Sequence, residues 1–213
     1  MKSLYERRPR IHGNGFVQLD LTPEMRLHIW NHPDIPKQKT PTPVHDHMFS
    51  FTSRILLGSM INKRYEALTE KDTSVFKPTH KIYTAKVREG EDTILVPSSA
   101  PVVELIDVGH RLYGCGQTYS MEVGDLHESI TEELTATIIV KTGRTLSQGG
   151  PSPRVFVPIG MEPDNDFNRY QMLPEDAIWW IIADTLWKAR HVDPKQLLMI
   201  CQVCNRSAID CLC

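Results

Sequence analysis

Three histidines lie in two short segments whose residue types and spacing suit a transition-metal ion. His45 and His47 stand two positions apart where a predicted strand begins, and alternate residues of an extended chain point to the same face. His127 follows a strand and a glycine turn far downstream. Two imidazoles from one strand and a third from a distant strand can form a three-nitrogen site that keeps open coordination positions. The sequence therefore predicts one divalent transition metal bound by His45, His47 and His127.

Three imidazole ligands also restrict the metal and its substrate. Neutral imidazole suits iron(II), which we favour, and also zinc or nickel, whereas magnesium and calcium prefer oxygen ligands. Three neutral ligands leave the charge of a divalent ion uncompensated. Such a centre favours an anionic substrate, for example a thiolate or an enolate, that binds the metal directly and leaves a neighbouring position for O2.

The histidines fall in the middle one of three predicted zones. Residues 1–40 contain two extended runs, at 15–21 and 25–30, and are expected to form an N-terminal arm whose strands join a barrel. Residues 41–160 read as many short strands separated by Gly, Pro, Asp and Ser, which is typical of an antiparallel β-barrel or sandwich. Residues 161–213 place apolar residues at helical spacing after Pro174 and again after Pro194, which predicts a C-terminal helical hairpin with a cysteine-rich tail. The expected fold is mainly β.

The composition excludes several classes of partner. The 24 Lys and Arg residues stand against 26 Asp and Glu, so the formal net charge of −2 does not draw the chain to nucleic acid. No apolar run reaches the roughly 20 residues of a membrane span, and the first residues lack the apolar stretch of a secretory signal. We therefore expect a cytoplasmic protein with no membrane partner, whose five cysteines are free thiols or metal ligands.

The two histidine segments resemble the two signature motifs of the cupin superfamily. The resemblance rests on His45-x-His47 with Gly58 and on Gly124-x-x-His127. More narrowly, the run from His45 to Gly58 is similar to the thiol dioxygenases of the cysteine dioxygenase type. This resemblance implies a double-stranded β-helix barrel and an Fe(II) ion, held by three histidines, that adds both atoms of O2 to a thiol.

The chain departs from ordinary cupins at one position of this site. Ordinary cupins carry a metal-binding Glu about four residues after the second histidine of the first motif. Residues 50–53 are instead Ser-Phe-Thr-Ser, so no carboxylate is available there. This departure favours the type of cupin whose metal is held by three histidines alone.

The strand predicted at 25–30 offers a candidate for substrate binding. One face carries Arg26, His28 and Trp30, and the other carries Met25, Leu27 and Ile29. If the polar face lines the barrel, Arg26 can clamp an anionic group of the substrate. Because apolar side chains are usually the buried ones, we expect the apolar face to point inward and Arg26 to lie in solvent.

Two tyrosines are further candidates. Tyr113 and Tyr119 lie on predicted strands, where their hydroxyl groups can reach the cavity of a barrel. Tyrosines in strands more often serve packing, and we interpret both residues in this way.

Three functions are compatible with these features. The first is an Fe(II)-dependent dioxygenase that oxidises a small anionic, thiol-type substrate with O2. The second is an isomerase or hydrolase that uses zinc, nickel or manganese as a Lewis acid without O2. The third is a non-catalytic ligand-binding or assembly module in which the histidines are structural. The helical hairpin would cap the barrel, or form the surface of a homodimer.

The C-terminal tail carries four thiols, at Cys201, Cys204, Cys211 and Cys213. Four thiolates are the number that a structural zinc site needs. However, Cys201 and Cys204 fall on the apolar face of the second predicted helix, where cysteine packs as a small hydrophobic residue. We therefore interpret these cysteines as packing residues rather than zinc ligands.

This interpretation predicts that the double replacement of Cys211 and Cys213 by Ser leaves zinc content and fold unchanged. Elemental analysis and circular dichroism of the purified variant measure both properties. The loss of one tightly held zinc would instead establish a structural cysteine site.

Overall fold

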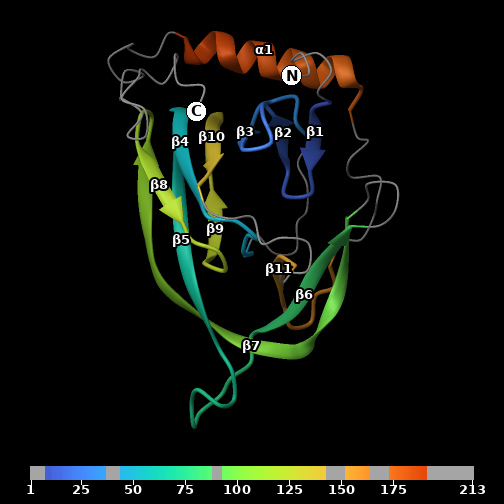
Figure 1. Cartoon of the computed structure of the whole chain (residues 1–213), viewed down its shortest axis with the longest axis vertical. Coiled ribbons are helices and arrows are strands. Elements are labelled where there is room, and N and C mark those ends of the chain that lie inside the picture. The colour runs from blue at the N-terminus through green and yellow to red at the C-terminus, as the bar shows by residue number, and fades with distance from the viewer. Residues whose placement is uncertain (1–7, 37–43, 88–92, 143–151, 164–172, 191–213) are drawn as a thin grey trace.

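The computed structural model describes residues 8–36, 44–87, 93–142, 152–163 and 173–190. Within these residues the chain forms two antiparallel β-sheets and a single helix, α1 (Glu175–Ala189), which lies across one end of the molecule (Figure 1). The mainly β prediction is therefore confirmed. The second helix of the predicted hairpin and the four cysteines of the tail lie outside the described residues. The helix of the described part is not both long and apolar enough to cross a lipid bilayer.

Each sheet combines strands that are distant in sequence. The six-stranded sheet runs in the order β1 (Arg10–His12), β2 (Phe16–Asp20), β3 (Met25–Trp30), β10 (Thr135–Lys141), β4 (Phe51–Leu57) and β8 (Thr118–Met121). The five-stranded sheet runs in the order β11 (Arg154–Pro158), β6 (His80–Val87), β7 (Thr93–Gly114), β5 (Ser59–Leu68) and β9 (Leu126–Ile130). The N-terminal strands therefore belong to the same sheet as β4, which directly follows the first histidine segment.

The predicted closed barrel is not formed. No continuous ladder joins the six-stranded sheet to the five-stranded sheet among the described strands. The chain crosses from one sheet to the other at Gly58, between β4 and β5, and the long strand β7 curves around the open side (Figure 1). The two sheets thus enclose a space without sharing an edge.

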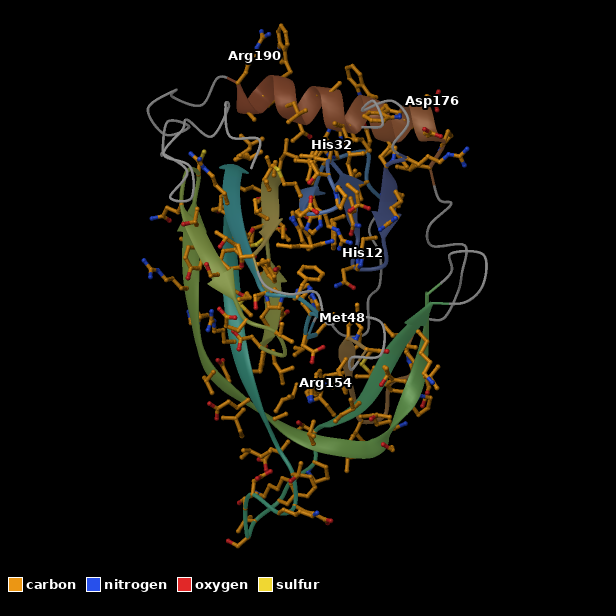
Figure 2. The ribbon with its side chains drawn as sticks, in the orientation of Figure 1. His12, His32, Met48, Arg154, Asp176 and Arg190 are labelled. Carbon is orange, nitrogen blue, oxygen red and sulfur yellow. The ribbon has the colours of Figure 1, made fainter. Side chains whose placement is uncertain are left out.

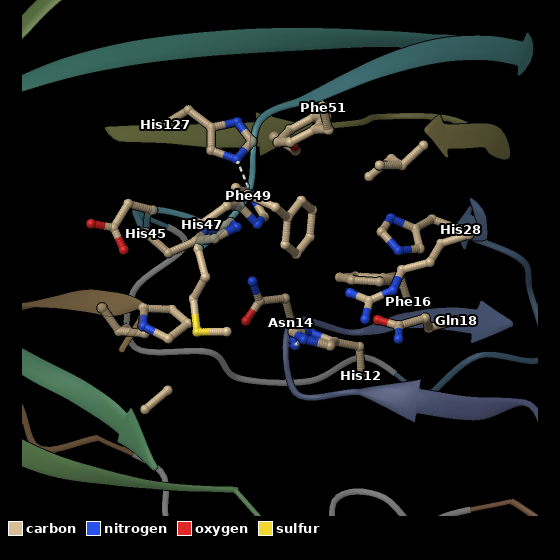
Figure 3. A pocket seen from close by; sticks show the side chains of 18 of the residues that line it. His12, Asn14, Phe16, Gln18, His28, His45, His47, Phe49, Phe51 and His127 are labelled. Atoms are coloured by element: carbon tan, nitrogen blue, oxygen red, sulfur yellow. Dashed lines mark hydrogen bonds between the residues drawn. The ribbon is translucent and has the colours of Figure 1, made fainter. Parts of the chain in front are cut away.

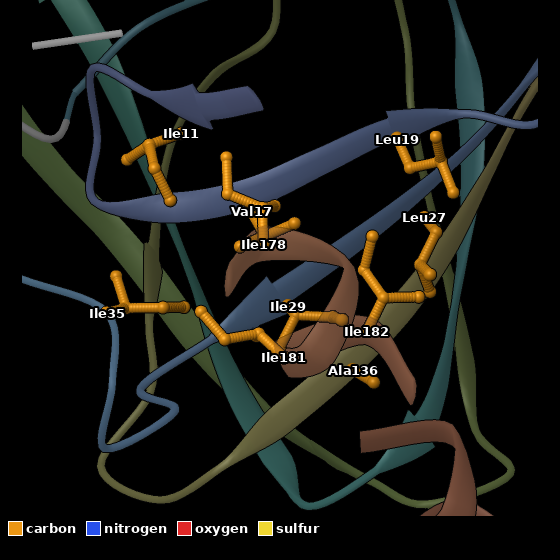
Figure 4. Close-up of a cluster of buried hydrophobic side chains, with 10 residues drawn as sticks. All are labelled: Ile11, Val17, Leu19, Leu27, Ile29, Ile35, Ala136, Ile178, Ile181 and Ile182. Atoms are coloured by element: carbon orange, nitrogen blue, oxygen red, sulfur yellow. The ribbon is translucent and has the colours of Figure 1, made fainter. Parts of the chain in front are cut away.

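Helix α1 covers the outer face of the six-stranded sheet. Its buried residues Ile178, Ile181 and Ile182 pack against apolar side chains of the N-terminal strands (Figure 4), among them Ile11, Val17, Leu19, Leu27 and Ile29. Complete burial of an isoleucine side chain contributes about 1.5–3 kcal/mol, so this contact is a large part of the core.

A buried polar contact fixes the position of the helix along the sheet. His32 lies in the loop after β3, beneath α1 (Figure 2), and its Nε2 is 3.0 Å from Oδ2 of Asp184. The same carboxylate accepts a hydrogen bond from Lys188 one turn further along the helix. The imidazole of His32 is almost completely buried, so this bond satisfies a group that water does not reach.

Strand β3 has the opposite orientation to the one that we expected: its apolar face points to the helix and its polar face points inward. Leu27 and Ile29 point outward to α1, so the polar face with Arg26 points inward. The side chain of Arg26 is 25% exposed, and its Nε donates to Oδ1 of Asp20 at 2.7 Å. The expectation that Arg26 lies in solvent was wrong because the apolar face of the strand is buried under the helix rather than inside the space between the sheets.

Gly58 has a conformation and surroundings that exclude a side chain. Its φ is +73°, in the left-handed region that favours glycine. A Cβ atom at this position would collide with the carbonyl oxygen of Leu134 and would lie 2.7 Å from Oγ1 of Thr135. Gly160 has a similar φ of +92°, but no atom lies within 4 Å of the position that its Cβ would take.

We predict that Gly58→Ala destabilises the protein much more than Gly160→Ala. The left-handed conformation alone costs a residue with a side chain about 1–2 kcal/mol, which applies to both positions. The collision adds about 1–3 kcal/mol at Gly58 only. Urea unfolding of both variants measures the difference, and equal losses of unfolding free energy would contradict this account of the crossing.

Candidate metal centre

The first histidine segment is held between the two edges of the five-stranded sheet. The backbone N–H of His45 donates to the carbonyl oxygen of His127 in β9, and the N–H of His127 donates back to His45, both at 3.0 Å. On the other side, the N–H of Asp46 donates to Arg154 in β11 at 3.1 Å. Residues that face each other in an antiparallel pair project their side chains to the same side. The imidazoles of His45 and His127 are therefore brought side by side.

The three predicted histidines converge at this point. Their ligand nitrogens all lie within 4.8 Å of one another, and Nε2 of His47 is 2.9 Å from Nε2 of His127 (Figure 3). Two nitrogens bound at right angles to one ion, each at about 2.1 Å, lie about 3.0 Å apart. The spacing of this pair therefore already fits a shared metal ion, and His45 completes the set from the same face of its strand.

A buried amide orients the third imidazole. Nδ1 of His127 lies 2.9 Å from Oδ1 of Asn62 in β5, and both side chains are almost completely buried. Because the amide oxygen accepts a hydrogen bond, Nδ1 carries the proton and Nε2 presents its lone pair to the other histidines. Sequence reasoning did not find Asn62. The signal in the sequence is weak: Asn62 follows Met60 at the next alternate position of β5, and both side chains are buried.

The surroundings keep two of the three ligands, His47 and His127, neutral. Burial, followed by the nearby His45 and His127, lowers the pKa of His47 well below its usual value. Burial, followed by His45 and Arg64, likewise lowers the pKa of His127. Neutral imidazole is the form that binds a metal ion, so these two residues need not lose a proton at neutral pH.

The carboxylates close in sequence do not join the cluster. Asp46 alternates to the other face of its segment, where it accepts hydrogen bonds from the backbone N–H and Nε of Arg154 at 2.5 and 2.6 Å. Glu122 accepts from the hydroxyl of Ser50 at 2.7 Å. Among the described residues the ligand cluster consists of histidines alone.

An aromatic ring occupies the place after the histidine motif where the resemblance would put a carboxylate. Phe51 is buried, and its ring centroid lies 4.8 Å from that of His47 and 6.1 Å from that of His127. The next residue, Thr52, lies on the opposite face of β4, where its hydroxyl bonds that of Ser120. An apolar group therefore shields the ligands on the side of β4.

The cluster lines a cavity of about 650 Å³ between the two sheets (Figure 3). Arg26 and Tyr119 contribute to its wall, whereas Tyr113 does not. The hydroxyl of Tyr119 is buried 3.5 Å from Sδ of Met60, and the ring of Tyr113 packs 5.0 Å from that of Tyr119. The structure thus brings Arg26 and Tyr119 to the cavity and places Tyr113 behind the wall as a packing residue.

Comparisons with known proteins add little to this description. No protein-family model matches the chain, and no curated protein matches it. Among solved structures, the chain is similar to a hydroquinone 1,2-dioxygenase from Sphingomonas sp. TTNP3, crystallised with 4-hydroxybenzoate bound. The TM-score is 0.31 and the identity 11%, over 58% of this chain and 63% of that chain, so less than two thirds of the dioxygenase is spanned. Membership of the cupin superfamily therefore stays a prediction from the two motifs.

We predict that the protein binds about one divalent metal ion per chain through the three histidines. Single replacement of His45, His47 or His127 by Ala should abolish tight binding of Co(II) while leaving the fold intact, as measured by elemental analysis, titration and circular dichroism. Asn62→Leu should keep all ligands but weaken binding by about 10–100-fold, because the orienting bond is lost. His110, which lies exposed on β7, provides the matched control, and His110→Ala should bind metal normally. Full metal occupancy in His127→Ala would contradict the proposed ligand set.

Proposed function

We propose that this protein is a mononuclear metal enzyme that oxidises a small anionic, thiol-type substrate with O2, with iron(II) bound by His45, His47 and His127. The observation that carries the proposal is a donor set of three imidazoles and no carboxylate, with His127 buried and His45 and His47 half-buried, which lines a cavity large enough for a small molecule. A bound iron(II) would supply redox chemistry and Lewis acidity at this point.

The three histidines and the phenylalanines beside them favour an anionic substrate in two ways. The neutral ligands contribute no negative charge, so an anionic group of the substrate is needed to balance a divalent ion. Phe51 and Phe49 pack with the ring of His47, at centroid distances of 4.8 and 5.5 Å, and keep water away from one side of it. An anionic ligand in such an apolar setting interacts more strongly with a cation than it would in water.

Positive side chains near the cavity support an anionic substrate as well. The guanidinium of Arg26 lies 5.5 Å from the ring centroid of Phe49, and the ammonium of Lys141 lies 5.0 Å from the same ring. Asp20 pairs with Arg26, so part of this charge is already balanced within the wall. The remaining positive charge favours the entry of an anion over that of a cation.

We predict that O2 consumption by the iron-loaded protein depends on the substrate. With iron(II) alone, O2 uptake should be negligible, because no anionic ligand balances the centre. A small thiol or another chelating anion should raise it, which an oxygen electrode measures with a panel of such compounds. If no compound raises it, the proposal fails. Turnover by the zinc- or nickel-loaded protein without O2 would favour an isomerase or hydrolase instead.

The position of Phe51 gives a second prediction. Phe51→Glu places a carboxylate beside His47 and His127, where it can bind the metal and occupy a substrate position. Thiol-dependent O2 uptake should then fall more than tenfold while metal affinity is kept or rises. Thr52→Glu adds the same charge one residue further along, on the opposite face of β4, and should keep O2 uptake within about twofold. Equal effects of the two changes would show that total charge, rather than access to the metal, controls the reaction.

A further inference from the structure

The wall of the cavity contributed by β2 and β3 carries buried polar groups that the metal centre does not use. Gln18 and His28 face each other across the two strands, and Phe16 faces Trp30 in the same way. Gln18 is 3% exposed and His28 is 7% exposed, and both line the cavity across from the three histidines (Figure 3). We call Gln18, His28 and Trp30 together the polar recess.

The polar recess contains three nitrogen atoms without a partner. Within the described residues, Nε2 of Gln18, Nε2 of His28 and Nε1 of Trp30 are buried and make no hydrogen bond. Buried polar atoms are satisfied in the great majority of cases, so three unpaired nitrogens on one wall of a cavity mark a place where a bound molecule can supply the missing partners.

The ring of Phe16 holds two of these groups in place. Its centroid lies 4.5 Å from that of His28 and 4.0 Å from that of Trp30. On the other side, the ring of His12 stacks on Phe16 at 4.4 Å. The imidazole and the indole therefore sit on an aromatic platform that fixes their orientation before any ligand arrives.

The chemistry of the polar recess is that of a hydrogen-bond donor. The amide of Gln18 and the indole of Trp30 present N–H groups at the unpaired atoms, and a neutral imidazole can do the same at Nε2. Burial, followed by the charges of Arg26 and Arg10, lowers the pKa of His28 to about 3, so this residue is neutral at physiological pH. The group that fits here accepts hydrogen bonds, and a positively charged group does not fit.

We infer that Gln18, His28 and Trp30 form a second anchoring site of the cavity, which binds a carbonyl-type oxygen of the substrate, either a carboxylate or an amide. The inference rests on the proposed function in one respect, since it assumes that the other end of the same molecule binds at the three histidines. It assigns the substrate to the class of thiols that end in an oxygen acceptor and excludes thiols that end in an amine.

The first test needs no metal and no activity. In metal-free protein with 15N-labelled tryptophan, the indole N–H resonance of Trp30 is identified by its loss in Trp30→Phe. Butyrate or butyramide should move this resonance downfield, as an acceptor binds the N–H, whereas butylammonium should leave it in place. A shift with butyramide alone would identify a neutral amide as the acceptor, and a shift with butyrate alone would identify a carboxylate. A resonance that no acceptor moves at saturating concentration would overturn the inference.

The second test joins the two ends of the cavity. Cobalt(II)-loaded protein reports thiolate binding by its charge-transfer absorption, without O2 chemistry. Within the series of mercapto acids from mercaptoacetate to 6-mercaptohexanoate, at least one should bind at least tenfold more tightly than the alkanethiol of the same length. The aminoalkanethiol of that length should bind no better than the alkanethiol. Equal affinities of the acids and the alkanethiols at every length, or a preference for the amine, would overturn the inference.

Variants connect the preference to the polar recess. Gln18→Leu keeps the approximate volume of the side chain and removes its N–H groups, so the ratio of acid to alkanethiol affinity should fall at least threefold. Thr52→Val lies outside the cavity and should keep the ratio of the unaltered protein. An unchanged ratio in both Gln18→Leu and His28→Phe would contradict the assignment. If O2 uptake fails but the Trp30 resonance responds, the proposed oxidation is wrong and the anchoring site stands.

Discussion

The backbone pair between His45 and His127 is the interaction on which the site depends. Two reciprocal N–H to carbonyl bonds place these residues face to face, although the chain between them builds the five strands β4 to β8. The same segment bonds to β11 through the N–H of Asp46, so it links both edges of the five-stranded sheet. The ion pair between Asp46 and Arg154 holds the other face of the segment. A three-histidine cluster made in this way forms only when the long-range pairing of the sheet is complete.

The second constraint is the helix that covers the six-stranded sheet. A sheet buries one face against a core, and here that face packs on α1, with Ile181 and its neighbours at the centre. The opposite face is then free to carry polar groups toward the cavity. Each unpaired buried polar group costs about 1–3 kcal/mol, which is similar to what one buried isoleucine contributes. The packing of α1 can therefore offset the cost of holding Gln18 and His28 ready for a ligand.

Local spacing was sufficient to predict the histidine cluster but not its surroundings. His45 and His47 share a face in any extended segment, and the glycine turn before His127 marks the start of the strand that carries this third histidine. The alternation in β3 was equally visible, yet it could not reveal which face points inward. That choice depends on α1, which comes after all the described strands in the sequence. The orientation of β3 is therefore a property of the tertiary structure. Asn62 was missed for the same reason, because its contact with His127 spans two strands.

The two ends of the cavity discriminate by different forces. Two unit charges about 4 Å apart interact by about 1 kcal/mol in water and by about 4 kcal/mol at an effective dielectric constant of about 20. With Phe51 against the histidines, a divalent ion at the centre would therefore prefer an anion to a neutral ligand by a large factor. At the other end, neutral N–H groups recognise an acceptor through hydrogen bonds, which depend on geometry more than on charge. A ligand that satisfies both ends must carry an anionic donor and a separate oxygen acceptor, and a molecule with only one of these leaves either a charge or a set of buried N–H groups unbalanced.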